Sequence, residues 1–346
     1  MTRQPKRGNS TRTDQSPLSE RQIMQKLRRV GALRHSTAGL RVGIGDDAAL
    51  FVPRPSFQTV LTCDWFLEGT HFLRDKHPPD SVGWKCLARA VSDIAAMGGA
   101  PRCFLLSLAL PPSHVGAWLD EFLSGLRRAQ RRLGCVLAGG DTTTSDRILI
   151  QVTVVGEVRS GKAVLRSGAK PGDAVFVSGR LGEAELGLRL LRSRKRIDRA
   201  DPRLRKHLYP EPQLRLGLWL AQKRLATAMM DLSDGLSTDL ARLCAASRVG
   251  ARIEAGRVPL PFHDSIERNR ERQIEPLHLA LHGGDDYELL FTVSATNLRR
   301  VPKSFGGVRL TQIGVITRER TLHLLAADGS KKDLVPGGWD PFRAAR

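Results

Sequence analysis

The sequence predicts an α+β protein with two domains that each mix helices and strands. Its 346 residues are enough for two domains of ordinary size. Short runs of branched apolar residues alternate with segments in which apolar residues recur every three or four positions. A stretch rich in turn-forming residues, 159–173, interrupts this alternation. We therefore predict a disordered basic tail at 1–17, an amino-terminal domain at 18–157 and a carboxy-terminal domain at 158–346.

The first predicted element is a helix at 18–27, with Ser16 as its N-cap and Pro17 at its first position. Amphipathic helices are predicted at 81–97 and 114–133, because their apolar residues fall on one stripe. Short branched runs bounded by Gly, Asp or Pro predict strands at 40–44, 59–63, 103–110, 135–138 and 148–155.

The carboxy-terminal half continues the same alternation. Strands are predicted at 174–178, 228–231, 252–254, 288–293, 308–316 and 322–326. Helices are predicted at 183–191, 213–225 and 236–246. Residues 189–206 hold nine Lys and Arg side chains. This basic run is typical of a solvated helix and loop, and a surface that binds RNA or another anion is the alternative.

The composition is that of a globular protein, with 41% hydrophobic and 26% charged residues. Residues 103–119 form the longest run without a charged side chain, and Pro111 and Pro112 interrupt it, so no membrane-spanning helix is expected. The basic residues 1–17 lack the apolar segment of a secretory signal, although their Arg and Ser content is also typical of an organellar transit peptide. Five widely spaced cysteines in apolar surroundings favour reduced thiols and a cytoplasmic location.

The formal net charge of +20 favours anionic partners. Nucleic acid, nucleotides, phosphorylated metabolites and an acidic membrane surface all have the required charge, and net charge alone does not choose among them. The sequence contains neither the phosphate-binding Gly-x4-Gly-Lys-Ser/Thr loop nor the His-Arg-Asp motif of protein kinases. Any phosphate chemistry therefore uses another kind of site.

Aspartates next to glycines recur along the chain, and we treat them as the candidate chemical site. Gly-Asp pairs occur at 45–47, 139–141 and 283–286, Asp64 and Asp231 end strands, and Asp93 lies within a helix. One such pair usually forms a turn or an N-cap. Asp93 is harder to explain in that way, because its helical neighbours are apolar and a partly buried carboxylate needs a partner.

Several carboxylates brought together repel one another and stay ionised only around a cation. Oxygen ligands favour Mg²⁺, which takes one or two protein carboxylates and completes its shell with substrate phosphates. Glycines beside the aspartates allow backbone N–H groups to approach phosphate oxygens closely. The pattern therefore indicates a phosphate site that holds Mg²⁺ or another hard divalent ion.

The ordered set of motifs resembles the thiamine-monophosphate kinase family over about residues 18–342. The motifs read GIGDDAA at 43–49, EGTHF at 68–72, SDIAAMG at 92–98, GGDT at 139–142, DLSDGL at 231–236 and GGDDYEL at 283–289. The resemblance implies the aminoimidazole ribonucleotide synthetase-like fold and a homodimer whose amino-terminal sheets pair. It also implies direct in-line transfer of a phosphoryl group from ATP to thiamine monophosphate, giving thiamine diphosphate, with several Mg²⁺ ions as cofactors.

The resemblance assigns roles to single residues. The amino-terminal domain is expected to bind ATP and Mg²⁺ and to dimerise, and the carboxy-terminal domain to complete the active site. The implied metal ligands, or neighbours of the ions, are Asp46, Asp47, Thr62, Cys63, Asp64, Asp93, Asp141, Asp231 and Asp234. The implied nucleotide contacts are Gly140, Asp141, Arg166 and Ser233. Asp141, Asp234 and Arg166 are expected to be catalytic, and His71, Asp285 and Trp339 to contact thiamine monophosphate.

Three residues depart from the family pattern. Pro341 stands where the family usually has His, Cys63 where a hydroxyl is commoner, and Asp285 where Glu is frequent. Two alternatives stay open, namely another ATP-dependent enzyme of the same superfamily and a basic nucleic-acid-binding protein on this scaffold. A protein that kept only the scaffold would have no physical reason to retain all these aspartates. We therefore expect ATP and thiamine monophosphate as partners, no specific nucleic acid and no membrane.

Overall fold

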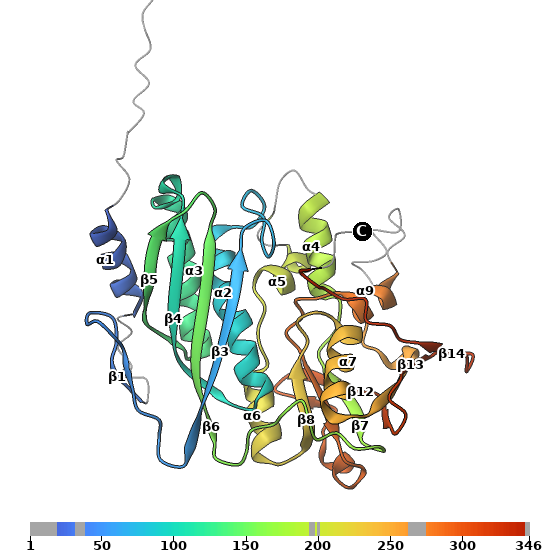
Figure 1. The fold of residues 1–346 in the computed structure, drawn as a ribbon. Coiled ribbons are helices and arrows are strands. Elements are labelled where there is room, and N and C mark those ends of the chain that lie inside the picture. The colour runs from blue at the N-terminus through green and yellow to red at the C-terminus, as the bar shows by residue number, and fades with distance from the viewer. Residues whose placement is uncertain (1–18, 32–38, 194–197, 199–200, 262–274, 343–346) are drawn as a thin grey trace, which may run out of the picture.

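The structure is a computed structural model that describes residues 19–31, 39–193, 198, 201–261 and 275–342. Two main β-sheets lie side by side, and helices pack against each of them (Figure 1). Along the chain, the last strand of the first sheet is β6 (Leu149–Arg159), and the first strand of the second sheet is β7 (Ala174–Ser178). The mixed α/β architecture is as predicted, and the boundary between residues 157 and 158 stays a prediction.

The first helix begins later than predicted. Helix α1 spans Glu20–Gly31, and Ser16 and Pro17 lie outside the described residues. Ser19 is the N-cap, because its hydroxyl accepts from the N–H of Gln22 while the Gln22 side chain accepts from the N–H of Ser19. This reciprocal pair is a capping box, and the sequence Ser-Glu-Arg-Gln contains its signature.

The first sheet has the strand order β3-β6-β4-β5. Strands β4 and β5 are parallel, and the other pairs are antiparallel. The predicted strands are confirmed in longer form, as β3 (Phe57–Leu67), β4 (Ala100–Leu110), β5 (Val136–Thr144) and β6. The strand predicted at 40–44 is the short β1 (Leu40–Val42), which pairs with β2 (Leu50–Phe51) in a separate two-stranded sheet.

Helices cover only one face of the first sheet. Helices α2 (Pro79–Ala96) and α3 (Ala117–Leu133) lie behind it in Figure 1, and none of the helices formed by the described residues lies in front of it. The covered face packs Val152, Val154 and Leu106 against the apolar stripe of α2. On the open face the side chains of Leu61, Trp65 and Leu105 are 67%, 54% and 38% exposed.

The second sheet has eight strands in the order β14-β13-β9-β12-β7-β10-β8, and β11 pairs with β12 off this path. All six predicted strands are present, as β7, β8 (Ala226–Asp231), β9 (Gly250–Glu254), β10 (Leu289–Val293), β12 (Val308–Thr317) and β13 (Leu322–Leu325). The three predicted helices are α4 (Glu183–Ser193), α6 (Leu214–Gln222) and α7 (Leu236–Ser247). Four short elements were not predicted, namely β11 (Ser304–Phe305), β14 (Lys331–Asp333), α5 (Pro202–Leu208) and α9 (Pro276–His282).

The end of the basic run is only partly solvated, since Arg205 is exposed while its neighbours Leu204 and Lys206 pack against the protein. Residues 194–197 and 199–200 lie outside the described residues, but α5 follows them. Its Leu204 and Leu208 are buried, and the ammonium of Lys206 pairs with the buried carboxylate of Glu288. Helix α5 is too short for its apolar period to stand out against so many charges, and for that reason the sequence pattern misses it.

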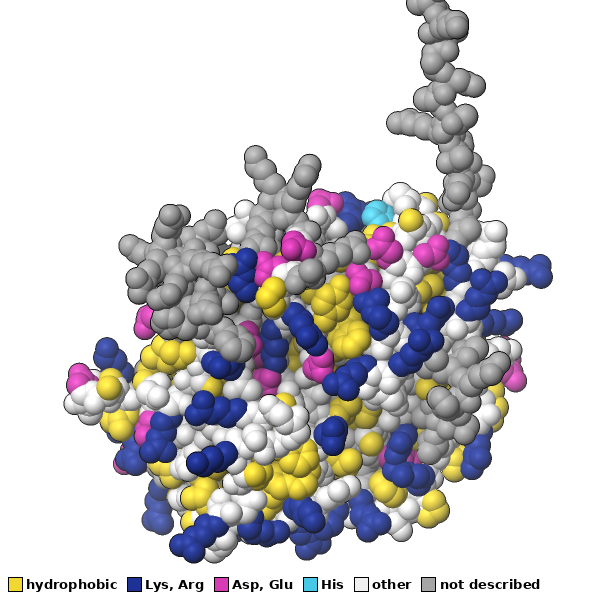
Figure 2. Space-filling model, turned by 180° about the vertical axis from the view of Figure 1, so that it is seen from behind, with side chains coloured by type: hydrophobic (Ala, Val, Ile, Leu, Met, Phe, Trp, Pro, Cys, Tyr) yellow, Lys and Arg dark blue, Asp and Glu magenta, His cyan; other side chains and the backbone are white. Residues whose placement is uncertain are grey.

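Membrane-spanning helices, disulfides and a basic surface stripe are three features that would indicate the partners or the compartment of the protein. Among the described residues, every helix is too short or too polar to cross a lipid bilayer. All five cysteines are free, and four of them are buried. Lys and Arg side chains are scattered over the face seen in Figure 2 rather than gathered in one stripe.

Candidate active site

The structure divides the predicted site residues between two cavities. The acidic cavity has a volume of about 550 Å³, and the predicted residues that line it are Asp64, His71, Asp93, Asp231, Ser233, Asp234, Asp285 and Trp339. The glycine-rich cavity has a volume of about 820 Å³ and is lined by Asp46, Asp47, Gly140 and Asp141. Thr62, Cys63 and Arg166 line neither cavity.

The acidic cavity lies where the two sheets meet, because each sheet provides part of its wall. Asp64 is on β3 of the first sheet, and Asp93 is on α2, which packs against that sheet. The hydroxyl of Thr62, two residues before Asp64, donates a hydrogen bond to Asp93. Side chains two apart on a strand share a face, so Thr62 and Asp64 both point towards α2. Thr62 therefore supports the site by orienting Asp93.

The second sheet contributes the turn at 231–235, which follows β8. The backbone N–H groups of Ser233 and Asp234 donate to the Asp239 carboxylate at 3.1 and 3.0 Å. Arg242 then pairs with both Asp234 and Asp239. Asp239 was not predicted as a site residue. Its position in the first turn of α7, next to an Asp-rich loop, could have indicated from the sequence that it supports this loop. It fixes the turn that presents Asp231 and Asp234.

The carboxy-terminal segment is anchored on the same turn. The N–H of Trp339 donates to the carbonyl oxygen of Asp234 at 2.9 Å. A Cβ on Gly338 would lie 1.8 Å from that oxygen, so only glycine permits this approach. The Trp339 side chain is 45% exposed at the wall of the acidic cavity, and Pro341 lines it as well. An exposed aromatic face is thereby held beside the carboxylates.

Asp285 is held by an unusual backbone and by two cationic side chains. Its φ is +68° and that of Tyr287 is +51°, values that non-glycine residues adopt rarely and at a cost of about 1–3 kcal/mol. Lys85 donates to one carboxylate oxygen at 2.8 Å, and the Tyr287 hydroxyl donates to the other at 2.6 Å. Burial raises the pKa of Asp285, but Lys85 and Arg89 outweigh it and hold that pKa well below its ordinary value. Asp285 is therefore an anion at neutral pH.

Arg89 is the functional candidate that the sequence pattern missed. It lines the acidic cavity, and its guanidinium lies 3.9 Å from Asp64 and 4.0 Å from Asp285. Both distances are too long for hydrogen bonds, and its buried Nε has no partner among the described residues. A guanidinium has five N–H donors, and leaving such donors unsatisfied in a buried place is costly. The side chain is therefore arranged to receive an anionic ligand.

His71 is neutral and has a defined tautomer. Burial, followed by the charge of Arg89, lowers the pKa of His71 to about 4. Its Nδ1 accepts a hydrogen bond from the backbone N–H of Leu67 at 3.0 Å. The proton of the neutral ring is therefore on Nε2, so His71 can donate one hydrogen bond to a ligand.

The side chains of the acidic cavity are suited to a hard divalent cation, because their donor atoms include the carboxylate oxygens of several aspartates. Burial raises the pKa of Asp64, and burial and the charge of Asp93 raise the pKa of Asp231 to about 8. The neighbouring aspartates add to the rise of both pKa values, because like charges repel one another. In the parts of the chain that the structure describes, no three His, Cys, Asp or Glu side chains form a ready cage for a metal. The donors that are present are carboxylate oxygens, the kind of ligand that Mg²⁺ takes when other oxygen atoms complete its shell.

The glycine-rich cavity lies on the other face of the first sheet. Asp141 is opposite Ser107, which is opposite Gln151, which in turn is opposite the exposed Trp65. Paired residues on neighbouring strands point to the same face, so Asp141 shares the open face with Trp65. Asp64 points to the helix-covered face. One chain therefore does not bring all the predicted aspartates together.

Cys63 and Arg166 lie apart from both groups. Cys63 is on the open face, where the amide of Gln151 donates to its sulfur at 2.7 Å. Strand alternation separates it from Thr62 and Asp64, which the sequence pattern had grouped with it. The side chain of Arg166 is exposed before β7, and its carbonyl oxygen accepts from Ser247 at 3.0 Å.

Comparison with protein families agrees with this division of the chain. Residues 45–158 match the family model described as AIR synthase related protein, N-terminal domain. Residues 170–325 match the corresponding C-terminal domain.

The chain is similar to several thiamine-monophosphate kinases along most of its length. It is 38% identical to that of Escherichia coli strain K12 over 316 residues, which are 90% of this chain and 94% of the other. The solved thiamine-monophosphate kinase of Stenotrophomonas maltophilia K279a has a TM-score of 0.77 and 34% identity, and the match covers 90% of this chain and 98% of that one. The structure of AaThiL complexed with AMPPCP and TMP has a TM-score of 0.73 and 34% identity, covering 86% of this chain and 91% of that one.

Proposed function

The chain belongs to the thiamine-monophosphate kinase family, and from this premise we propose that it transfers the γ-phosphoryl group of ATP to thiamine monophosphate. The products are thiamine diphosphate and ADP. The observation that best supports the proposal is the acidic cavity. It combines carboxylates for a cation, an arginine for a phosphate and an aromatic face for a ring. A relative with 34% identity is described as a complex with AMPPCP and TMP.

The transfer needs orientation more than acid–base catalysis. A phosphate oxygen of thiamine monophosphate attacks the γ-phosphorus of ATP, and a new P–O bond forms there. The bond from this phosphorus to the bridging oxygen breaks, and its electron pair leaves with ADP. Because the attacking oxygen is already anionic at neutral pH, no strong general base is required. The barrier is mainly the repulsion between two polyanions.

The residues of the acidic cavity address this repulsion. We assign one or two N–H donors of Arg89 to the phosphate of thiamine monophosphate, because its buried Nε has no hydrogen-bond partner in the described parts of the chain and its guanidinium lies 3.9 Å from the nearest carboxylate oxygen. Anionic Asp285 attracts the cationic thiazolium ring, and the exposed face of Trp339 allows a stacking or cation–π contact with the same substrate. His71 donates from Nε2 to the bound substrate.

The proposed transfer depends on Mg²⁺, which when bound would neutralise part of the phosphate charge. In the acidic cavity Asp64, Asp93, Asp231 and Asp234 are its candidate ligands, and Thr62 orients Asp93. In the glycine-rich cavity Asp46, Asp47 and Asp141 are the candidate ligands, and Gly140 and Asp141 are proposed nucleotide contacts. Ser233 of the acidic cavity and Arg166, which lines neither cavity, also stay proposed nucleotide contacts.

We also propose that the enzyme is a cytoplasmic homodimer. The open face of the first sheet supports dimerisation, because three large apolar side chains are exposed there in one area. Free cysteines support a reducing compartment.

The direct test incubates the purified full chain with ATP, Mg²⁺ and thiamine monophosphate and separates the products by chromatography. Thiamine diphosphate and ADP are expected in equal amounts. Omitting Mg²⁺ is expected to stop the reaction, and restoring it is expected to recover the rate. Phosphate release without thiamine diphosphate, or a better reaction with free thiamine, would show that the substrate is wrong.

A further inference from the structure

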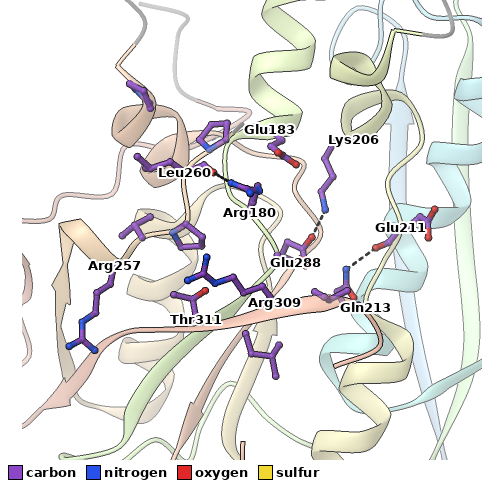
Figure 3. Close-up of a pocket in the computed structure, with 18 of the residues that line it drawn as sticks. Arg180, Glu183, Lys206, Glu211, Gln213, Arg257, Leu260, Glu288, Arg309 and Thr311 are labelled. Atoms are coloured by element: carbon purple, nitrogen blue, oxygen red, sulfur yellow. Dashed lines mark hydrogen bonds and ion pairs between the residues drawn. The ribbon is translucent and has the colours of Figure 1, made fainter. Parts of the chain in front are cut away.

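A third cavity contains none of the residues assigned above. We call it the basic cavity; its volume is about 1380 Å³, and it lies beside β7 and β12 of the second sheet. Its walls are α5, the connection at 256–261, the residues after β7 and the first half of β12. Figure 3 shows Arg180, Arg309 and Thr311 on one side of this space and Lys206 opposite them.

The lining of the basic cavity has more positive than negative charge. It includes six Lys or Arg side chains and three Glu side chains. Glu288 pairs with Lys206, and Glu211 pairs with Arg205 and with Arg132 from outside the cavity. Lys303 and Arg309 form no ion pair within the described ranges. An anion entering this space would therefore find cationic donors that are not already neutralised.

A buried hydroxyl lies at the same side of the cavity. The Oγ1 of Thr311 has no hydrogen-bond partner among the residues the structure describes. In Figure 3 the side chain of Thr311 lies next to the guanidinium of Arg309, and Arg180 lies above both. A hydroxyl beside two guanidinium groups is a typical set of donors for phosphate oxygens. Val258, Pro259 and Leu260 add an apolar wall for an uncharged part of the same ligand.

The basic cavity and the acidic cavity share a wall. On α5, Lys206 faces the basic cavity while the next residue, His207, lines the acidic cavity. In the segment before β10, Asp285 and Tyr287 line the acidic cavity and Glu288 lines the basic one. His207 lies 3.3 Å from the ammonium of Lys85, which holds Asp285. A ligand that draws Lys206 away from Glu288 would thus act on the two elements that position Asp285.

We propose that the basic cavity binds a small phosphorylated anion of nucleotide size, as a site separate from the active site. Pockets for small ligands measure about 300–1,000 Å³, so the volume is sufficient for a nucleotide and its hydration. The charge excess and the Thr311 hydroxyl select for phosphate, and the apolar wall favours a ligand with a ring. If the proposed function is taken as given, the shared wall has a further consequence. A ligand bound in the basic cavity is expected to change the KM for thiamine monophosphate more than kcat.

The binding test uses calorimetry on the full chain at ~150 mM salt with EDTA, so that no divalent metal supports binding elsewhere. The probes are ADP and inorganic tripolyphosphate, titrated into wild type, Arg309→Ala and Arg318→Ala. Arg318 is exposed just beyond β12, outside the cavity, and is the matched control. We expect one equivalent of ligand on wild type, at least tenfold weaker binding to Arg309→Ala and unchanged binding to Arg318→Ala. Tighter binding of ADP than of tripolyphosphate indicates a nucleotide, and equal binding indicates recognition of phosphates alone.

Two results would overturn the proposal. Equal losses in Arg309→Ala and Arg318→Ala would mean that dispersed surface charge binds the probes. Displacement of the probe by short duplex DNA, with the same dependence on Arg309, would mean that the cavity is part of a nucleic-acid surface. Unchanged melting temperatures of both variants show that they are folded. Because none of these measurements requires turnover, a failure of the proposed kinase reaction would be seen separately in the product assay.

Discussion

Asp93 is on α2, which packs against the first sheet, and its side chain lines the acidic cavity between the first and second sheets. Its carboxylate accepts from Thr62 on β3, and its charge contributes to raising the pKa of the buried Asp231 at the end of β8. A carboxylate that links elements in this way supports ligand binding more than folding, because it adds repulsion to the folded protein.

Replacing Asp93 with Asn is expected to lower kcat by about two orders of magnitude or more, since a charged ligand at the reacting phosphates is lost. Asn keeps an oxygen that accepts from Thr62, so the melting temperature is expected to stay the same or rise. Asp120→Asn, an exposed change on α3, is the matched control for both measurements. Near-normal turnover at limiting Mg²⁺ would remove Asp93 from the site.

Replacing Arg89 tests whether its guanidinium binds the phosphate of thiamine monophosphate. Arg89→Ala is expected to weaken the binding of thiamine monophosphate by about 10- to 100-fold, the value of one or two charge-assisted hydrogen bonds. Binding of free thiamine, which lacks the phosphate, is expected to change much less. Calorimetry with both ligands on wild type and variant measures the difference, and Arg89→Lys is expected to recover part of the loss. An equal loss for both ligands would mean that Arg89 only supports the cavity.

Asp286 gives the folded protein a pH dependence that can be isolated. The buried carboxyl accepts from the N–H groups of Gly182 and Ala184 at the start of α4. Burial raises the pKa of Asp286 to about 7, although Lys206 opposes this. The folded-state pKa thus lies above the unfolded one, and the protonated form is the stabilising one. Its contribution is complete below about pH 4 and is lost as the pH rises through about 7.

The measurement compares melting temperatures of wild type and Asp286→Asn between pH 4 and pH 8. Wild type is expected to lose stability relative to the variant as the pH rises, because Asn is neutral throughout. Asp146→Asn, an exposed change, is expected to track wild type. Parallel curves for all three proteins would contradict the assignment.

At the scale of elements, the position of α2 depends on close contact with α3. A Cβ on Gly125 of α3 would lie 1.8 Å from the carbonyl oxygen of Asp80, and a Cβ on Gly83 of α2 would lie 2.0 Å from that of Phe122. The two backbones therefore approach as closely as glycine allows. Because α2 holds Lys85, Arg89 and Asp93, this contact also sets the geometry of the acidic cavity.

Gly125→Ala is expected to destabilise the protein by about 1–3 kcal/mol or more, since the contact is with backbone and cannot relax easily. Activity is expected to fall as well, because α2 must shift. Gly256→Ala is the control, with no atom within 4 Å of the added Cβ, and it is expected to change stability by less than about 0.5 kcal/mol. Chemical unfolding followed by circular dichroism measures both. A stable Gly125→Ala variant would mean that the helices separate at little cost.

Elements with a clear period were predictable, and short elements were not. The stripe on α2 and the branched run of β6 define these elements locally, because burial on one face requires that pattern. Helix α5, with seven residues, and strand β14, with three, are held by contacts with distant segments. The start of α1 was misplaced because Ser16-Pro17 and Ser19 both carry helix-start signals, and only Ser19 completes a capping box.

At the scale of the whole molecule, the open face of the first sheet predicts the assembly. Its exposed Leu61 and Trp65 lie on the same face of β3. Trp65 pairs with Gln151 of β6, and Gln151 lines the glycine-rich cavity, so this cavity is close to the exposed apolar residues. A large apolar area exposed on a sheet is typical of a protein interface.

Sedimentation velocity is expected to give twice the mass of one chain for wild type and a single-chain mass for Trp65→Glu. A charge at this position would be buried unpaired in the interface. Val335→Glu is the control, because Val335 is an exposed apolar residue at 67% exposure far along the chain from this sheet. A single-chain mass for wild type, or a dimeric Trp65→Glu, would contradict dimerisation through this face.

The order of the elements with a clear hydrophobic period and the kinds of chemistry in the chain could be predicted from the sequence, because hydrophobic period and motif composition are local properties. The tertiary structure alone decided which aspartates share a cavity. Strand alternation separates Cys63 and Asp141 from Asp64 by placing them on opposite faces of one sheet. Packing also joins Lys85 to Asp285 across 200 residues and leaves the buried Nε of Arg89 without a hydrogen-bond partner among the described residues, since a buried charge takes its partners from whichever segments fold around it.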